Sequence, residues 1–193
     1  MGDPKKQRKK YETPRFRWRK DILQEELKLL GQYGLRNKHE LWRHKTTLSK
    51  TRGIARSLIG KTPEERGKME NELLMRLKKI GILDETAVLD NVLDLSIENM
   101  LERRLQTIAF RKGLTRTIFQ ARQLITHGHI NIGNRCVTVP GYIVSKEEEK
   151  EITYSPQSAL VKEAHPLRQG LTVVAKQPEI RPPPRGRRGG RRF

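Results

Sequence analysis

The sequence has few cysteines, few aromatic residues and no long apolar run. Cys136 stands alone among 193 residues, which excludes an intrachain disulfide and a zinc site built from several cysteines. No stretch reaches the length of a transmembrane helix, and the start MGDPKKQRKK lacks the apolar region of a signal peptide. We therefore expect a cytoplasmic chain that does not enter a membrane and folds without a metal or cofactor.

Acidic residues are also scarce, since 22 Asp and Glu stand against 41 Lys and Arg, a formal net charge of +19. Such a chain repels itself unless a polyanion neutralises it, so nucleic acid is the first candidate partner and an anionic membrane the second. Of the blocks 1–60, 61–102, 103–160 and 161–193, only 61–102 has more acids than bases, so the basic surface has to be assembled from separate segments. With only 34% apolar residues, we expect modest cores and long arms.

Residues 1–20 alternate bases with aromatic residues and have neither helical nor strand periodicity. We predict a basic extended arm, in which aromatic rings stack on bases or ribose while cations contact phosphates. Tyr11, Phe16 and Trp18 are the rings placed between cations. The alternative is a disordered basic tail.

Residues 21–95 are predicted to form a helical subdomain of successive helices with recognisable starts and ends. The first is capped by Asp21, carries the apolar stripe Ile22, Leu23, Leu27 and Leu30, and ends at Gly31. The predicted boundaries of the next two are Asn37, with Glu40 three residues later, to Gly60, and Thr62-Pro63 to Gly81.

Residues 96–155 are predicted to form two amphipathic helices followed by small strands. One helix runs from an N-cap at Ser96 to Gly113, with Arg104, Thr107 and Arg111 on a cationic face opposite its apolar face. The other starts at Thr115 and ends before Gly128. On its two sides lie an apolar group and a polar group: Ile118, Ala121 and Ile125 against Arg116, Gln120, Gln123 and His127.

The strands expected after these helices are short. Alternating apolar residues flank Gly133 and Asn134, a pair suited to a tight hairpin turn, and residues 142–144 and 151–154 can add two more strands. We predict an α+β fold, in which this module of two helices on a small antiparallel sheet follows the helical subdomain. EEEKE, residues 147–151, is predicted to be a solvated loop.

These residues resemble a known RNA-binding module, the one named after small-subunit ribosomal protein four. The matching positions are Arg104-Leu105, Gly113, Thr115-Arg116, Ala121 to Ile125, Gly128 and Ile130. There are two departures, since Gln106 stands where an Asp is common and Gly133-Asn134 replaces an Asn-Gly turn. A second stretch, Glu26 to Arg43, resembles the archaeal and eukaryotic branch of that ribosomal family, so the likeness extends over residues 21–155.

The resemblance implies a small-subunit ribosomal protein that binds small-subunit rRNA at a multi-helix junction, nucleates assembly and supports decoding accuracy. Neighbouring ribosomal proteins, and mRNA on the side where it enters, are the other partners it implies. Arg122, at the flank of the apolar face, is expected to pack its stem while its guanidinium reaches a phosphate. The predicted RNA-binding residues are Arg15, Arg17, Trp18, Arg19, Arg103, Arg104, Arg111, Lys112, Arg116, Arg122, Gln123, His127, His129, Asn134 and Arg135.

Two alternatives share the module, an RNA-modifying enzyme and a free-standing RNA-binding regulator. The module is accompanied by no nucleophile–base pair, no acid–base dyad and no small-molecule site. We therefore predict that the protein is not an enzyme. ARSLIGKT, residues 55–62, fits a relaxed phosphate loop, but helical residues precede it and its first Gly is absent. The histidine pairs His39/His44 and His127/His129 lack the neighbouring carboxylates or thiols that a metal site needs. Residues 156–193 are predicted to be a basic, largely disordered tail.

Overall fold

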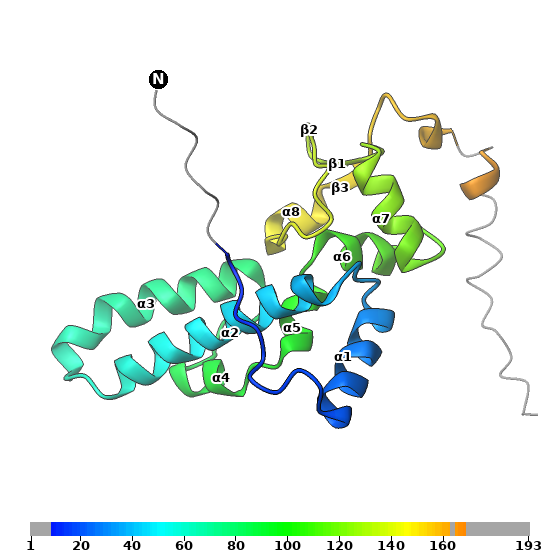
Figure 1. The fold of residues 1–193 in the computed structure, drawn as a ribbon. Coiled ribbons are helices and arrows are strands. Elements are labelled where there is room, and N and C mark those ends of the chain that lie inside the picture. The colour runs from blue at the N-terminus through cyan, green and yellow to red at the C-terminus, as the bar shows by residue number, and fades with distance from the viewer. Residues whose placement is uncertain (1–8, 163–164, 169–193) are drawn as a thin grey trace, which may run out of the picture.

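The computed structural model of the protein describes residues 9–162 and 165–168 and has the predicted α+β class (Figure 1). The predictions for residues 1–8 and for the arginine-rich end of the chain lie outside these residues. In chain order the elements are α1 (Lys20–Gln32), α2 (Lys38–Ile59), α3 (Pro63–Ile80), α4 (Leu89–Asp94), α5 (Ile97–Glu102), α6 (Leu105–Arg111), α7 (Ile118–Thr126), β1 (Ile130–Ile132), β2 (Arg135–Cys136), α8 (Lys146–Lys150), β3 (Ile152–Tyr154) and a 3-10 turn (Ala159–Val161). No helix in this part of the chain is both long and apolar enough to cross a membrane.

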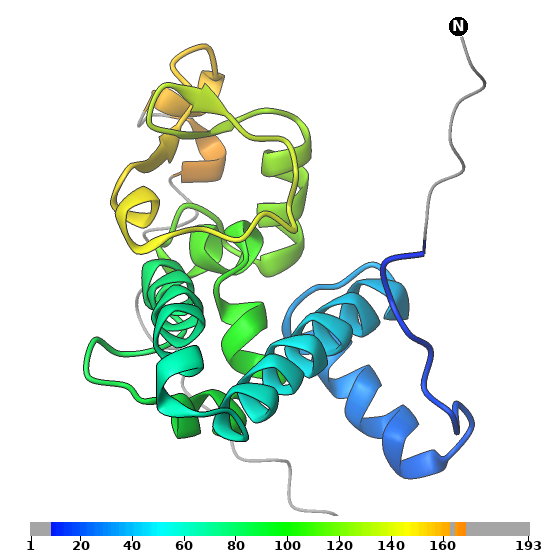
Figure 2. The same ribbon diagram turned by 90° about the vertical axis from the view of Figure 1, so that its left-hand side faces the viewer.

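The helices α2 and α3 lie side by side, with α4 and α5 packed against α2 (Figures 1 and 2). The predicted start of α2 and the predicted end of α3 are both confirmed. Asn37 caps α2 by accepting a hydrogen bond from the Glu40 backbone N–H at 3.2 Å, and Gly81 ends α3 with a φ of +81°. The core between the helices consists of Leu48, Ala55, Leu58, Leu74, Leu77, Leu83, Leu89, Val92, Leu95 and Met100.

Helix α1 departs from the predicted apolar stripe at Leu27, while Ile22, Leu23 and Leu30 are half-buried. Leu27 is 60% exposed, whereas Glu26 is only 2% exposed. The Glu26 carboxylate accepts hydrogen bonds from Trp42 Nε1 at 2.9 Å and Lys45 Nζ at 3.1 Å. Burial raises the pKa of Glu26, but these bonds outweigh it and hold the pKa below its usual value. A paired carboxylate that the sequence did not indicate therefore joins α1 to α2.

The single helix predicted from Ser96 to Gly113 is wrong, because the chain leaves the helical conformation at residues 103–104. Ser96 does cap α5, and Gly113 follows α6 with a φ of +72°. Arg104 between them is extended, with ψ of 141°, and forms an antiparallel bridge with Ile143. The Leu105 N–H donates to the Tyr142 carbonyl at 2.8 Å. Pairing with a distant segment therefore replaces local helical bonds and turns α6 away from α5.

Helix α7 begins two residues later than predicted. Thr117 is its N-cap and accepts a hydrogen bond from the Gln120 N–H at 3.1 Å, whereas Thr115 is buried. The end of the helix was predicted correctly, since Gly128 follows it with a φ of +75°.

The sheet has the order β2-β1-β3, with both neighbours antiparallel to β1. Gly133 turns the β1–β2 hairpin with a φ of +56°, as predicted. Two other predictions are wrong. The segment 142–144 contributes the isolated bridge at Ile143 rather than a strand, and residues 146–150 form helix α8 rather than a loop. Ser145 and Glu148 start α8 with a reciprocal capping box.

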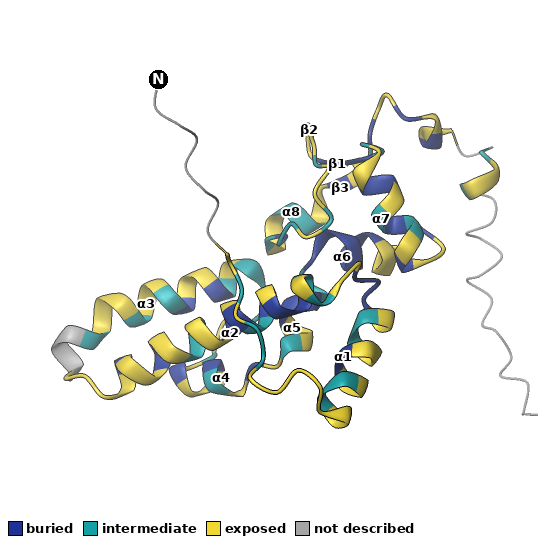
Figure 3. Ribbon diagram, in the orientation of Figure 1, coloured by how far each residue is buried: buried dark blue, intermediate teal, exposed yellow. Residues whose placement is uncertain are grey.

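The module has its own core between α6, α7 and the sheet (Figure 3). Leu160 is only 4% exposed and packs into this core, so the chain still contacts the module after β3. The core residues are Leu105, Ile108, Ala109, Ala121, Leu124, Ile125, Ile130, Ile132, Val144, Ile152 and Leu160.

Candidate nucleic-acid interface

The N-terminal arm is docked on α2 through its first aromatic residue. The Tyr11 ring stacks on His39 with ring centroids 4.8 Å apart, and the Glu12 N–H donates to Thr46 Oγ1 at 2.9 Å. Tyr11 is therefore occupied by the protein itself. Trp18 is 88% exposed, and the arginines around it, Arg15, Arg17 and Arg19, are exposed as well. An exposed indole between guanidiniums is suited to stacking on a base beside phosphate contacts.

Helix α7 has the two faces that its sequence indicates. Ile118, Ala121 and Ile125 are buried, while Arg116, Gln123 and His127 are exposed. Among the described residues Arg116 forms no ion pair, so its guanidinium is open to a ligand. Phe119, 60% exposed, adds an aromatic ring to this helix.

The predicted exposed position of Arg104 is wrong, because the break between α5 and α6 turns the side chain inward. Arg104 is 1% exposed, and its Nη2 lies 3.0 Å from Glu40 Oε2. Thr107, predicted on the same cationic face, is also buried and donates to the Leu101 carbonyl. Arg104 therefore faces α2 rather than a surface shared with Arg116.

Glu40 holds a second guanidinium, that of Arg122. The two Arg122 terminal nitrogens lie 2.6 Å from Oε1 and 3.2 Å from Oε2 of Glu40. Burial alone would raise the pKa of Glu40, but the hydrogen bonds and charges of Arg122 and Arg104 hold it below its usual value. The Arg122 side chain is 23% exposed, so its stem packs as predicted, but its guanidinium is held by Glu40.

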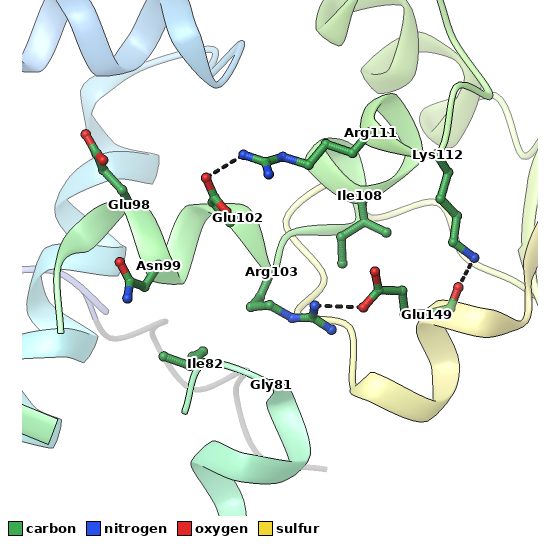
Figure 4. A pocket seen from close by; sticks show the side chains of 10 residues that line it. All are labelled: Gly81, Ile82, Glu98, Asn99, Glu102, Arg103, Ile108, Arg111, Lys112 and Glu149. Carbon is green, nitrogen blue, oxygen red and sulfur yellow. Dashed lines mark hydrogen bonds and ion pairs between the residues drawn. The ribbon is translucent and has the colours of Figure 1, made fainter. Parts of the chain in front are cut away.

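Three other predicted cations line a pocket of about 500 Å³ between α3, α5, α6 and α8 (Figure 4). Arg103 pairs with Glu149 at 2.7 Å, Arg111 pairs with Glu102, and Lys112 donates to the Glu149 carbonyl. Glu98 lines the same pocket, so its acids balance its bases. We call this the acid-balanced pocket; its cations are largely neutralised by the chain itself.

The remaining predicted residues lie at the hairpin and at the end of α7. Asn134 and Arg135 are exposed on the turn, and Arg135 Nη2 lies 3.5 Å from Glu148 Oε1. The His127 and His129 rings are parallel, with centroids 6.3 Å apart. Nδ1 of His129 is 2.9 Å from Ser158 Oγ, so one of the two ring nitrogens of this imidazole already has a partner within the protein.

The sequence did not indicate Glu40, Arg43 and His44 as functional residues. Together with Arg104 and Arg122 they line a pocket of about 500 Å³ between the arm, α2 and residues 139–143. Glu40 was identified only as a helix-start residue, because its contact with Arg122 spans 82 residues of sequence. Within the described residues no cluster of His, Cys, Asp and Glu is arranged to hold a metal ion.

Comparison with known proteins assigns the sequence to an established family. Residues 103–150 match the S4 domain family. The chain is 54% identical to the small ribosomal subunit protein uS4 of Hyperthermus butylicus over 162 residues, which cover 84% of this chain and 92% of the relative. It is 51% identical to the protein of the same name from Ignicoccus hospitalis over 85% of this chain and 99% of the relative. For that of Sulfurisphaera tokodaii the identity is 52%, over 88% and 96%. The resemblance seen in the sequence is thereby confirmed, and the chain belongs to the uS4 family of small ribosomal subunit proteins.

Proposed function

We propose that the chain is a structural component of the small ribosomal subunit that binds small-subunit rRNA directly, nucleates assembly and supports translational accuracy. The observation that carries this proposal is the relationship, over most of the chain, to proteins named for the small ribosomal subunit. The net charge of +19 supports a polyanionic partner. The S4 domain match over residues 103–150 supports the same conclusion.

We also propose where the protein works and which molecules it contacts. The protein works in the cytoplasm as part of the small subunit, beside neighbouring ribosomal proteins and near mRNA where it enters. It has no catalytic role. Of the predicted RNA-binding arginines among the described residues, four are not paired with the chain's own acids and are the first candidates to meet RNA. These are Arg15, Arg17 and Arg19 of the arm and Arg116 just before α7.

Cosedimentation tests the ribosomal role. The tagged full chain is expressed in an archaeal host, and small subunits are purified through sucrose gradients after a high-salt wash. A primary rRNA binder stays with the subunit, because many phosphate contacts and a folded interface hold it. A free-standing regulator is washed off at the same salt, so recovery of the chain only in the top fractions contradicts the proposal.

A second experiment tests the arm. In the salt dependence of binding to a small-subunit rRNA fragment, each phosphate contact contributes roughly 0.7–0.9 to the log–log slope. Replacing Arg15, Arg17 and Arg19 together by Ala should flatten the slope by about 2–3 units if all three contact phosphates. The matched control replaces Lys50, Lys68 and Arg76, three exposed cations of α2 and α3, by Ala. Equal slopes for the two triple variants would exclude specific arm contacts.

A further inference from the structure

The pocket between the arm, α2 and the module has three different walls. The arm contributes Tyr11, α2 contributes residues of its first three turns, and the module contributes two arginines and the segment 139–143. We call this the junction pocket. It has a volume of about 500 Å³ and is lined by Tyr11, Asn37, His39, Glu40, Arg43, His44, Thr47, Arg104, Arg122, Val139, Pro140, Gly141 and Ile143.

The charge of the junction pocket is not balanced by its own residues. Arg43, Arg104 and Arg122 line it, whereas Glu40 is its only carboxylate. Arg104 is 1% exposed, and its Nε and Nη1 have no hydrogen-bond partner among the described residues. A buried guanidinium that shares its only counterion is incompletely compensated, so a second anion close to it would stabilise the charge further. The arrangement therefore has the charge of a site whose anionic ligand comes from outside the chain.

His44, which lines the junction pocket, is affected by the same excess of positive charge. It is 7% exposed, and burial, followed by the positive charges of Arg104 and Arg43, lowers its pKa to about 4. Glu40 opposes this shift but does not cancel it. The imidazole is neutral near pH 7, so it does not add to the charge of the pocket, but it senses any anion that enters.

The acid-balanced pocket of Figure 4 gives the contrast. It has a similar volume, yet Arg103, Arg111 and Lys112 are matched there by Glu98, Glu102 and Glu149. An anion would gain little from those cations, because each is already engaged or opposed by an acid. Of these two pockets, the junction pocket alone has an excess of guanidinium over carboxylate.

We propose that the junction pocket binds one phosphate group of the RNA, with the attached nucleoside in the remaining space. This rests on the proposed function and specifies one contact of it. The exposed Arg43 offers a planar donor pair that matches a phosphate, while the partly exposed Arg122 and the buried Arg104, both held by Glu40, add positive charge.

The rest of the pocket suits a nucleoside better than a bare ion. Pockets of roughly 300–1,000 Å³ accommodate small organic molecules, and a phosphate alone fills a minor part of such a volume. The Tyr11–His39 ring pair and the apolar side chains of Val139, Pro140 and Ile143 line the space next to the charges. Nucleotides splayed out of single-stranded RNA are recognised by this combination of an aromatic or apolar wall and cationic donors.

The first test uses the full chain with inorganic phosphate, uridine monophosphate and acetate at matched ionic strength. The readouts are the His44 pKa, followed by NMR of the imidazole, and the unfolding temperature. We expect both phosphates to raise the pKa of His44 and the unfolding temperature, and the nucleotide to bind more tightly than inorganic phosphate. Absence of any shift with both phosphates overturns the proposal. A larger response to acetate than to phosphate also overturns it, since the occupant would then be a carboxylate of a neighbouring protein.

Three variants test whether the nucleotide binds in the junction pocket. Arg43→Gln removes an exposed guanidinium from the pocket, and Arg56→Gln removes the same charge about 20 Å further along α2. We expect Arg43→Gln to weaken nucleotide binding roughly tenfold or more and Arg56→Gln to leave it unchanged. Glu40→Gln should bind phosphate more tightly than the parent chain, because it removes the competing carboxylate. Should that variant fail to fold, the two arginine variants still decide.

Binding to a small-subunit rRNA fragment separates this inference from the proposed function. If the parent chain binds the fragment and Arg43→Gln loses no more affinity than Arg56→Gln, the junction pocket is not an RNA contact and only the inference fails. If the parent chain does not bind the fragment while phosphate still shifts His44, the pocket takes a free anion. The proposed function and the RNA part of the inference then both fail.

Discussion

Glu40 and Arg104 lie 64 residues apart in the sequence and form an ion pair of 3.0 Å between α2 and the start of α6. The bond joins the helical subdomain to the module, and the same carboxylate also holds Arg122 of α7. Because Arg104 is almost entirely buried, its charge depends on this one counterion within the described chain. The pair is therefore part of the fold as well as of the junction pocket.

Arg104→Gln should lower the free energy of unfolding by about 1.5–3 kcal/mol, because it removes a buried charge-assisted hydrogen bond and leaves Glu40 with Arg122 alone. Urea unfolding followed by circular dichroism measures it. Arg111→Gln is the control, since Arg111 and Glu102 are 57% and 40% exposed and such a pair contributes at most about 1 kcal/mol. Equal losses in the two variants would show that the buried position of Arg104 does not matter for stability.

Gly34 lies at a second joint between the subdomain and the module. Its φ is +57°, its carbonyl accepts a hydrogen bond from Gln106 Nε2 at 3.0 Å, and an added Cβ would lie 2.8 Å from Ile118 Cγ2. Gly34→Ala should therefore destabilise the protein by roughly 1–3 kcal/mol through strain and overpacking. Gly53→Ala, inside α2 with nothing within 4 Å, should instead stabilise it by about 0.5–1 kcal/mol. Thermal unfolding of both variants measures these opposite signs, and a stabilised Gly34→Ala would contradict the close contact.

The helix boundaries that the sequence predicted correctly depend on neighbouring residues. Asn37, Ser96 and Gly81 act within one turn of their own helix, so their chemistry determines the boundary. The break at Arg104 could not be predicted in this way, because it depends on pairing with Ile143 and Tyr142. Helical periodicity continues across the break, and only the pairing with residues 142–143 in the folded chain competes with it.

The candidate site follows the same division between local and distant causes. Exposure of Trp18 and of the polar face of α7 follows from local pattern and was predicted correctly. Tyr11 looked equally available, but His39 and Trp42 cover it with their rings. The carboxylates of α8 likewise reach Arg103 and Arg135 across the module, although their sequence indicated a solvated loop. Which cations remain free is thus decided by tertiary ion pairs that a sequence pattern does not contain.

Protonation of His44 should make stability depend on pH between about 6.5 and 4. Burial and the charges of Arg104 and Arg43 lower its pKa from 6.5 to about 4, so the unfolded chain binds a proton that the folded chain does not in this window. The stabilisation is complete above pH 6.5 and is lost as pH falls toward 4, by at most about 3 kcal/mol. His44→Met should flatten the stability profile in this window. Its acid limb below about pH 4.5 should remain, because the unfolded chain protonates Glu40 there, whereas the folded chain, in which the pKa of Glu40 is lowered, keeps it ionised to lower pH. Parallel profiles for parent and variant would contradict a neutral buried imidazole.

Helix α7 should separate folding from RNA binding by its two faces. Ile125 is fully buried, and Ile125→Ala should cost roughly 2–5 kcal/mol of stability through the cavity it leaves. Phe119→Ala, in the same helix but 60% exposed, is the matched control and should change stability by no more than about 0.5 kcal/mol.

Arg116→Ala should weaken RNA binding and leave stability unchanged, which is the opposite of the effect expected for Ile125→Ala. The Arg116 backbone N–H, which donates to Gln120 Oε1 at 2.8 Å, is retained in the variant, so the helix start is unaffected. Loss of the exposed guanidinium should weaken binding to a small-subunit rRNA fragment by about 1.5–3 kcal/mol, the usual contribution of a charge-assisted hydrogen bond. Filter binding at moderate salt measures the affinity, and urea unfolding of the same samples measures stability. If Arg116→Ala binds as tightly as the parent while Ile125→Ala, corrected for its folded fraction, binds more weakly, the polar face of α7 is not the RNA contact.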